Sequence, residues 1–245
     1  MKILLAPAET KNEGGSLTPF CKENFFLETL FDKREEVFSH YEKHIEQLSV
    51  EELSHWFGIK KLEDVKKYKQ SLKSKPTMKA IERYNGVAFD AIDYPKLDEK
   101  SQKYIDENVI LFSNLFGALK ADDAIPDYKY KQGAKLPTLN VEKFYLESFT
   151  EELDDYLGEE VLDLRAGYYD KFYKVKKASV ITVKFIKDGK VVSHWAKHYR
   201  GEVVKQLALH TIESFAEFMN LSIEGLSLKE IQEKKNIKTL IMEIL

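Results

Sequence analysis

The sequence predicts a mixed α/β (α+β) fold, with a central mixed sheet flanked by helices in a single domain over residues 1–245. Short apolar stretches of strand length alternate with longer amphipathic stretches, which is typical of a sheet with helices beside it. Asp188-Gly189 separates two of the short stretches, and this dipeptide is a strong signal of an antiparallel hairpin. No Pro/Gly/Ser-rich linker and no internal repeat divides the chain.

Each expected strand is either a buried apolar run or an alternation of apolar and polar residues. In chain order, the expected strands are residues 2–6, 87–92, 109–112, 161–164, 178–186, 190–195 and 239–244. The segment 113–139 contains Gly117, Pro126, Gly133 and Pro137, so it is expected to form one long loop. Loops of this length in a compact domain are usually functional.

The expected helices carry apolar residues three or four positions apart, in places behind an N-capping side chain. Ser49 with Glu52 three residues later is a capping-box pattern, which predicts a helix that starts at Val50. The expected helices are residues 24–48 (one or two helices), 50–58, 63–72, 77–84, 98–107, 141–157, 202–219 and 228–235. Residues 25–75 are therefore expected to be a helical insertion in the domain.

The composition is that of a globular protein: 43% of the residues are hydrophobic and 32% are charged. Cys21 is the single cysteine, so an internal disulfide is excluded and a reducing compartment is expected. No run approaches 18 apolar residues, and residues 1–6 lack the pattern of a secretory signal. We therefore expect no membrane partner and a cytoplasmic location.

The charge is strongly segregated along the chain although the formal net charge is only −3. Residues 142–170 hold ten acids and two bases, whereas residues 171–201 hold nine bases and one acid. Residues 58–79 hold eight lysines against two acids. If the fold gathers the two basic segments on one side, they form a positive face that suits a polyanion. The alternative is that these lysines are ordinary solvated surface, as the net charge favours.

A turn at Gly58-Ile59-Lys60-Lys61 joins two expected helices and resembles a helix–hairpin–helix element. Such a turn presents backbone N–H groups to a DNA phosphate, and nearby lysines add attraction that does not depend on sequence. The lysines concerned are Lys60, Lys61, Lys66 and Lys67. The second glycine of such hairpins is missing here, so a plain turn between helices is the alternative.

Three polar segments each border an expected strand end, and ligands of α/β sheets gather at the carboxyl ends of strands. These segments are residues 113–136, 163–169 and 193–201. If they converge, they form a cleft whose candidate residues are Ser113, Asp123, Tyr128, Lys129, Arg165, Tyr169, His194, Lys197 and Arg200. The alternative is a buried salt-bridge network that braces long loops.

No cofactor or metal site is expected. Gly14-Gly15 lacks the spacing of a phosphate-binding or dinucleotide-binding loop. His40 and His44 are four residues apart on an expected helix, but the helix supplies no third ligand and no His-Glu-x-x-His pattern. A surface pair is the simpler interpretation.

Five blocks of the sequence together resemble the YaaA family of peroxide-stress proteins. They are residues 3–11 (ILLAPAETK), 83–93 (RYNGVAFDAID), 113–129 (SNLFGALKADDAIPDYK), 163–169 (DLRAGYY) and 194–201 (HWAKHYRG). The resemblance covers nearly the whole chain, in order and at the right separations. Lys120 and Lys129 stand where the family has arginine, which keeps the charge but loses the planar fork.

The resemblance implies a single α/β domain with a helix–hairpin–helix-like element and a positive cleft. It also implies DNA binding of low sequence specificity, and protection of DNA and proteins during peroxide stress by limiting free intracellular iron. Lys120, Lys129, Arg165, Lys197 and Arg200 would then join the lysines of the turn in binding DNA through its backbone phosphates, whether the DNA is double-stranded or otherwise structured.

Two functions therefore remain open at the level of sequence. The first is a DNA-binding protein of the kind just described. The second is an enzyme that holds a nucleotide-like or other small anionic ligand in the polar cleft, with Asp123 or Tyr128 as general acid or base. The oligomeric state cannot be predicted from the sequence.

Overall fold

The computed structural model describes the backbone of all 245 residues and every side chain except that of His194. The strands of its main sheet are β1 (Lys2–Leu5), β5 (Val109–Ser113), β6 (Gly117–Lys120), β8 (Glu160–Asp163), β9 (Ser179–Lys187), β10 (Lys190–Val191), β11 (Leu226–Lys234) and β12 (Ile237–Ile244). Two further ladders pair β2 (Thr10–Lys11) with β4 (Tyr84–Asn85), and β3 (Thr77–Lys79) with β7 (Ala124–Pro126).

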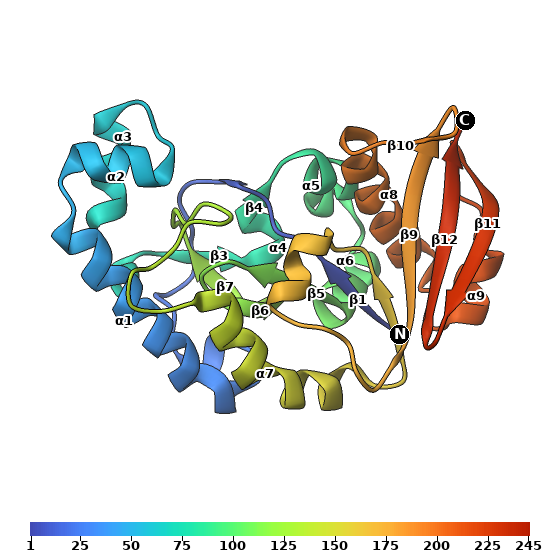
Figure 1. Cartoon of the computed structure of the whole chain (residues 1–245), viewed down its shortest axis with the longest axis horizontal. Coiled ribbons are helices and arrows are strands. Elements are labelled where there is room, and N and C mark those ends of the chain that lie inside the picture. The colour runs from blue at the N-terminus through green and yellow to red at the C-terminus, as the bar shows by residue number, and fades with distance from the viewer.

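The main sheet has eight strands in the order β11-β12-β9-β8-β1-β5-β6, with β10 paired to β9 (Figure 1). β1 is parallel to both β5 and β8, and β9 is parallel to β8 and β12. The pairs β5–β6, β9–β10 and β11–β12 are antiparallel. The predicted mixed α/β class is thus confirmed. Ile3, Leu4 and Leu5 of β1 are buried, which explains why this parallel strand is a continuous apolar run.

The helices are α1 (Phe31–Gln47), α2 (Val50–Phe57), α3 (Leu62–Lys66), α4 (Ala80–Arg83), α5 (Val87–Ile92), α6 (Glu99–Asn108), α7 (Val141–Leu157), α8 (His194–His210) and α9 (Phe215–Asn220). Six short 3₁₀ segments cover Lys22–Asn24, Glu28–Leu30, Lys67–Lys69, Leu72–Ser74, Tyr94–Lys96 and Gly167–Lys171. The predicted capping box at Ser49 is present, because Ser49 Oγ accepts from the Glu52 N–H and the Glu52 carboxylate accepts from the Ser49 N–H. No described helix combines the length and the apolar character that crossing a bilayer requires.

The helical segment 25–75 packs onto the rest of the molecule through aromatic rings. The ring of Phe38 on α1 packs edge-on against that of Phe116, with 4.8 Å between the ring centres. The ring centre of Phe20 is 5.2 Å from that of Phe38. Arg34, also on α1, is fully buried and donates to the carbonyls of Phe116 and Ala118 beside β6. The hydrophobic core therefore runs without interruption from the sheet into α1, and α2 and α3 extend from it at one end of the long axis (Figure 1).

Four secondary-structure predictions are wrong in whole or in part. Residues 77–84 were expected to be one helix, but Thr77–Lys79 form β3 and only Ala80–Arg83 are helical. The single helix expected over 202–219 is interrupted between α8 and α9. Residues 87–92 form α5 rather than a strand. Ala88 and Ala91, three residues apart, both approach Gly201 and so share the helical face that packs against α8. The segment 228–235 lies in strand β11 rather than in a helix. Its Lys- and Glu-rich sequence favours a helix locally, but ladder hydrogen bonds to β12 along its whole length outweigh that preference.

The three polar segments are also more regular than expected. The segment 113–139 contains β6 and β7, so two strands interrupt the predicted loop. Residues 194–201 are the first two turns of α8, which starts eight residues before the predicted helix at 202. The hairpin at Asp188-Gly189 is present, but its second strand, β10, is only two residues long.

Candidate functional site

The polar site lies where the chain changes direction across the sheet. From β1 the chain reaches β5 on one side and later β8 on the other, so the carboxyl ends of three parallel strands meet at one edge. Such a topological switch point leaves a crevice that α/β proteins use for ligands. Ser113 ends β5 and Asp163 ends β8, and the loop after β1 leads to Lys11.

Three hydroxyl groups form a chain behind this edge. The Ser113 Oγ and Tyr128 Oη atoms are 2.7 Å apart, and Tyr128 Oη lies 2.8 Å from Tyr84 Oη. Ser113 Oγ also accepts the backbone N–H groups of Leu115 and Phe116. All three hydroxyl residues are buried, and burial raises the pKa of Tyr84 to about 12. The hydroxyls are therefore protonated donors at neutral pH.

Lys11 lies against these tyrosines, because β2 and β4 place Lys11 opposite Tyr84. The Lys11 Nζ atom is 4.2 Å from the centre of the Tyr128 ring and 5.4 Å from that of Tyr84. The side chain is only partly exposed, and burial lowers the pKa of Lys11 to about 7. The positive charges of Lys129 and Arg83 lower this pKa further, whereas Glu9 and Asp127 oppose the shift.

Two acids and two bases surround Lys11. Glu9 Oε1 accepts the backbone N–H of Gln132 and so holds the loop that covers the edge. Asp127 is partly buried, and burial raises its pKa against the pull of the cations around it. Arg83 is fully buried and donates to the carbonyls of Gly14 and Ile125. Lys129 is partly exposed, and its charge faces Lys11.

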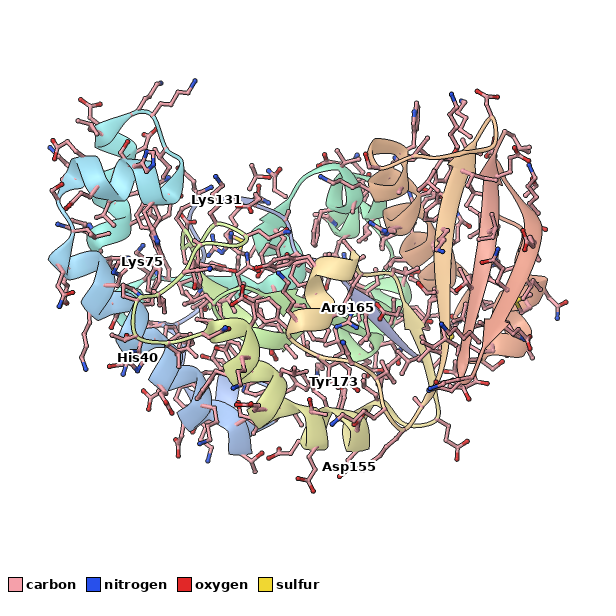
Figure 2. All side chains as sticks on the ribbon, in the orientation of Figure 1. His40, Lys75, Lys131, Asp155, Arg165 and Tyr173 are labelled. Atoms are coloured by element: carbon pink, nitrogen blue, oxygen red, sulfur yellow. The ribbon has the colours of Figure 1, made fainter. Side chains whose placement is uncertain are left out.

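Arg165 is at this edge but is used within the protein. Its guanidinium forms a bidentate pair with the Asp163 carboxylate, with Nε–Oδ1 and Nη2–Oδ2 distances of 2.9 and 2.7 Å. It also donates to the carbonyl of Tyr173, which lies near it in Figure 2, at 3.1 Å. The Arg165 guanidinium carbon is 4.4 Å from the centre of the Phe112 ring. Tyr169, in the 3₁₀ segment that follows, is buried, and burial raises its pKa. Arg165 therefore fits the salt-bridge alternative rather than a ligand contact.

Arg200 approaches the same strand end from α8. Burial lowers the pKa of Arg200, and the negative charge of Asp163 only partly opposes this shift. The buried Arg200 Nε has no hydrogen-bond partner among the described atoms. Gly201 permits this approach, since a Cβ atom there would lie 2.0 Å from the Ala88 carbonyl oxygen of α5. Lys197, one turn earlier, is exposed. The third residue predicted on this segment, His194, starts α8, but its side chain lies outside the described part of the structure.

Lys120 and Asp123 lie at the opposite edge of the sheet. β6 runs antiparallel to β5 and pairs Lys120 with Ile110 near the start of β5, so the chain has turned away from Ser113. Lys120 pairs with Asp122 at 3.1 Å. Asp123 accepts the backbone N–H groups of Phe26 and Lys120 and braces a turn. The structure does not bring these two residues to the predicted cleft.

The turn between α2 and α3 is at the far end of the long axis from α8 (Figure 1). Gly58 has φ of 68°, and the Ile59 N–H donates to the Ser54 carbonyl, which ends α2. Lys60, Lys61 and Lys66 are exposed, and no described acid pairs with them, whereas Lys67 pairs with Glu13. A Cβ atom at Gly58 would lie 3.9 Å from Lys131 Nζ, so the loop after β7 extends the positive charge toward the sheet edge (Figure 2).

The structure thus brings together Ser113, Tyr128, Lys129, Tyr169 and Arg200 at one edge, and sequence reasoning missed Lys11 and Tyr84. The signal available for these two was their place in the blocks at residues 3–11 and 83–93.

The two histidines of α1 do not form a metal site. A hydrogen bond of 2.7 Å joins His40 Nδ1 to Thr138 Oγ1, and the His44 ring packs edge-on against Trp56. Among the described residues, no three His, Cys, Asp or Glu side chains are grouped to hold a metal ion.

Comparison with known proteins reveals relatives along the whole chain. The family model described as peroxide stress protein YaaA matches residues 1–232. The chain is 46% identical to an uncharacterised protein of Campylobacter jejuni over 246 residues, covering all of both chains. It is 35% identical to a UPF0246 protein of Corynebacterium glutamicum, covering 99% of this chain and all of the other. It is 24% identical to a UPF0246 protein of Fusobacterium nucleatum, covering 96% and 97% of the two chains.

Proposed function

The chain belongs to the YaaA family of peroxide stress proteins, and on that premise we propose that it is a cytoplasmic DNA-binding protein of low sequence specificity. In peroxide stress it protects DNA and proteins from oxidation by limiting free intracellular iron. The DNA part of this proposal is supported by charged groups in the structure. The iron part is supported by the family resemblance, and it needs a test in cells.

One observation carries the DNA proposal: the exposed lysines of the α2–α3 turn are not committed to acids among the described residues. Lys60 and Lys61 lie on the turn and Lys66 ends α3, whereas ten other lysines of the chain form ion pairs. A lysine without an acidic partner gains more from a phosphate. It also releases a condensed counterion when it binds, so affinity falls with salt.

Lys131, near Gly58, continues this set onto the loop after β7, and we add Lys129 on the same loop and Lys197 and Arg200 on α8. Contacts of this kind reach phosphates rather than base edges, so they fix the duplex without reading its sequence. Lys120 and Arg165 are left out of the proposed contact set, since each is paired with an acid within the chain.

The DNA proposal is tested by fluorescence anisotropy with two labelled 30-base-pair duplexes of unrelated sequence. We expect both to bind with similar affinity, and we expect Lys60→Glu/Lys61→Glu to weaken both by more than tenfold. Lys234→Glu/Lys235→Glu is the matched control and is expected to change affinity less than threefold. These two lysines are also adjacent and exposed, lie where β11 turns into β12, and pair with no described acid. Equal binding by the turn variant and the parent would refute the role of the turn.

The iron proposal is tested in cells that lack the gene, by electron paramagnetic resonance of chelated free iron after peroxide treatment. We expect the gene to lower the free-iron signal to the wild-type level. If the Lys60→Glu/Lys61→Glu variant restores the level as well as the parent does, the effect on iron does not depend on DNA binding by the turn. An unchanged iron signal in the deletion strain would refute the iron proposal itself.

A further inference from the structure

The buried hydroxyl chain has one hydrogen more than its own contacts can use. Ser113 Oγ accepts two backbone N–H groups, so it donates its own hydrogen to Tyr128. Tyr128 and Tyr84 then share one contact, at 2.8 Å, but carry two hydroxyl hydrogens. One tyrosine O–H is therefore left without an acceptor among the described side chains and carbonyls. A buried donor without an acceptor is costly, so an oxygen atom from outside the protein belongs there.

Lys11 places an amine beside the rings of the two tyrosines. No carboxylate of the described residues is within ion-pair distance of the Lys11 Nζ atom. Among these residues its one hydrogen bond, at 3.4 Å, is to the backbone carbonyl of Glu9, two residues earlier. The groups that face it come from three elements: Glu9 on its own segment, Arg83 and Tyr84 on α4 and β4, and the sequence Asp127-Tyr128-Lys129 after β7. Two of the charged neighbours are basic and two are acidic.

The place of the cluster in the fold also favours a ligand. It lies at the carboxyl ends of β1 and β5, at the switch point of the sheet. Lys11 and Lys129 are partly exposed, whereas the hydroxyls behind them are buried. An incoming group would thus meet two amines first and a fixed hydroxyl donor behind them, an arrangement that fits an oxyanion.

We propose that Lys11, Lys129 and the Tyr84–Tyr128 hydroxyl pair form a site for one small oxyanion, the phosphate or carboxylate group of a small molecule, and that Lys11 takes up a proton when it binds. This site contains none of the lysines of the α2–α3 turn, although it shares Lys129 with the proposed DNA contacts, and it does not depend on the DNA proposal. An anion beside Lys11 favours its charged form, so binding and protonation are coupled.

The site is tested by trace acetylation of the folded protein with acetic anhydride, followed by mass spectrometry of the lysine peptides. With a pKa near 7, Lys11 has a neutral amine fraction at pH 7 that is about a thousand times that of an ordinary lysine. We expect Lys11 to be acetylated far ahead of the exposed Lys100 on α6. Inorganic phosphate or adenosine monophosphate at 10 mM should slow the acetylation of Lys11 at least fivefold and leave Lys100 unchanged.

Duplex DNA is the second arm of this experiment. If DNA slows the reaction of Lys11 and neither phosphate nor the mononucleotide does, the oxyanion is a DNA phosphate and the proposed small-molecule site is wrong. The proposal is also overturned if none of the three slows the reaction.

The hydroxyl pair is tested with Tyr84→Phe and Tyr128→Phe. We expect at least one of them to need fivefold more phosphate for the same protection of Lys11. Tyr104→Phe is the control, because Tyr104 is a buried tyrosine that bonds the Ile212 carbonyl away from the site. Protection unchanged in both variants would overturn the role of the hydroxyls, and the parent measurement stands even if a variant fails to fold.

Discussion

The side-chain nitrogen of Lys11 lies 4.2 Å from the centre of the Tyr128 ring, although 117 positions separate the two residues in the sequence. This contact joins the segment after β1 to the segment after β7. It places a partly buried amine beside a buried hydroxyl chain, and the low dielectric around it lowers the pKa of Lys11 to about 7.

The Lys11 pKa predicts a pH dependence of stability. This pKa is lower in the folded protein than in the unfolded chain, so between pH 7 and 10 the unfolded chain binds more protons and stability rises with pH. Lys11→Met removes this contribution. Relative to the variant, we expect the parent to gain on the order of 1–3 kcal/mol between pH 7 and 10, measured by urea unfolding. If the free energy of unfolding changed with pH in the same way for the parent and for Lys11→Met, the lowered pKa of Lys11 would be contradicted.

The contact between α5 and α8 predicts that Gly201 cannot be replaced by a larger residue. Gly201→Ala gains about 1 kcal/mol of helix propensity, but its Cβ atom would lie 2.0 Å from the Ala88 carbonyl oxygen. We expect a net loss of about 2–4 kcal/mol in the free energy of unfolding, since the helices must separate. Gly167→Ala, where a Cβ meets nothing within 4 Å, should change it by less than about 1 kcal/mol. If the two substitutions changed the free energy of unfolding equally, α5 and α8 would not be as close at Gly201 as the 2.0 Å approach requires.

The fork between Arg165 and Asp163 predicts a structural rather than a ligand-binding role for Arg165. Arg165→Gln leaves Asp163 without its partner and should cost about 3 kcal/mol in urea unfolding. Lys177→Gln breaks the exposed pair with Asp155 and should leave the urea midpoint nearly unchanged, because water screens that pair. If Arg165→Gln instead left stability intact and weakened DNA binding, Arg165 would belong to the interface after all.

Much of the fold could be predicted from local sequence. β1, β5 and β8 are buried apolar runs, and the Ser49 capping box and the Asp188-Gly189 hairpin are local signals with fixed geometry. α5 and β11 could not be predicted, because their conformation is decided by the partners α8 and β12. A short segment with an ambiguous period takes the conformation that buries it best.

The site shows the same limit. Ser113 and Tyr128 were predicted because they border strands in sequence. Lys11 and Tyr84 are brought together by the β2–β4 ladder although they are 73 positions apart in the sequence. No local sequence pattern predicts that pairing. Asp123 was expected in the cleft because the segment 113–136 was expected to be one loop, whereas β6 carries the chain to the opposite edge of the sheet.

The salt dependence of DNA affinity tests the central claim most directly. The anisotropy titration is repeated between 50 and 300 mM salt for the parent and for Lys60→Glu/Lys61→Glu. We predict a log–log slope of about −4 to −6 for the parent, as expected for roughly five to seven neutralised phosphates, and a slope shallower by about 2 for the variant. The account is contradicted if the parent does not bind even at 50 mM salt, or if its affinity is the same across the range.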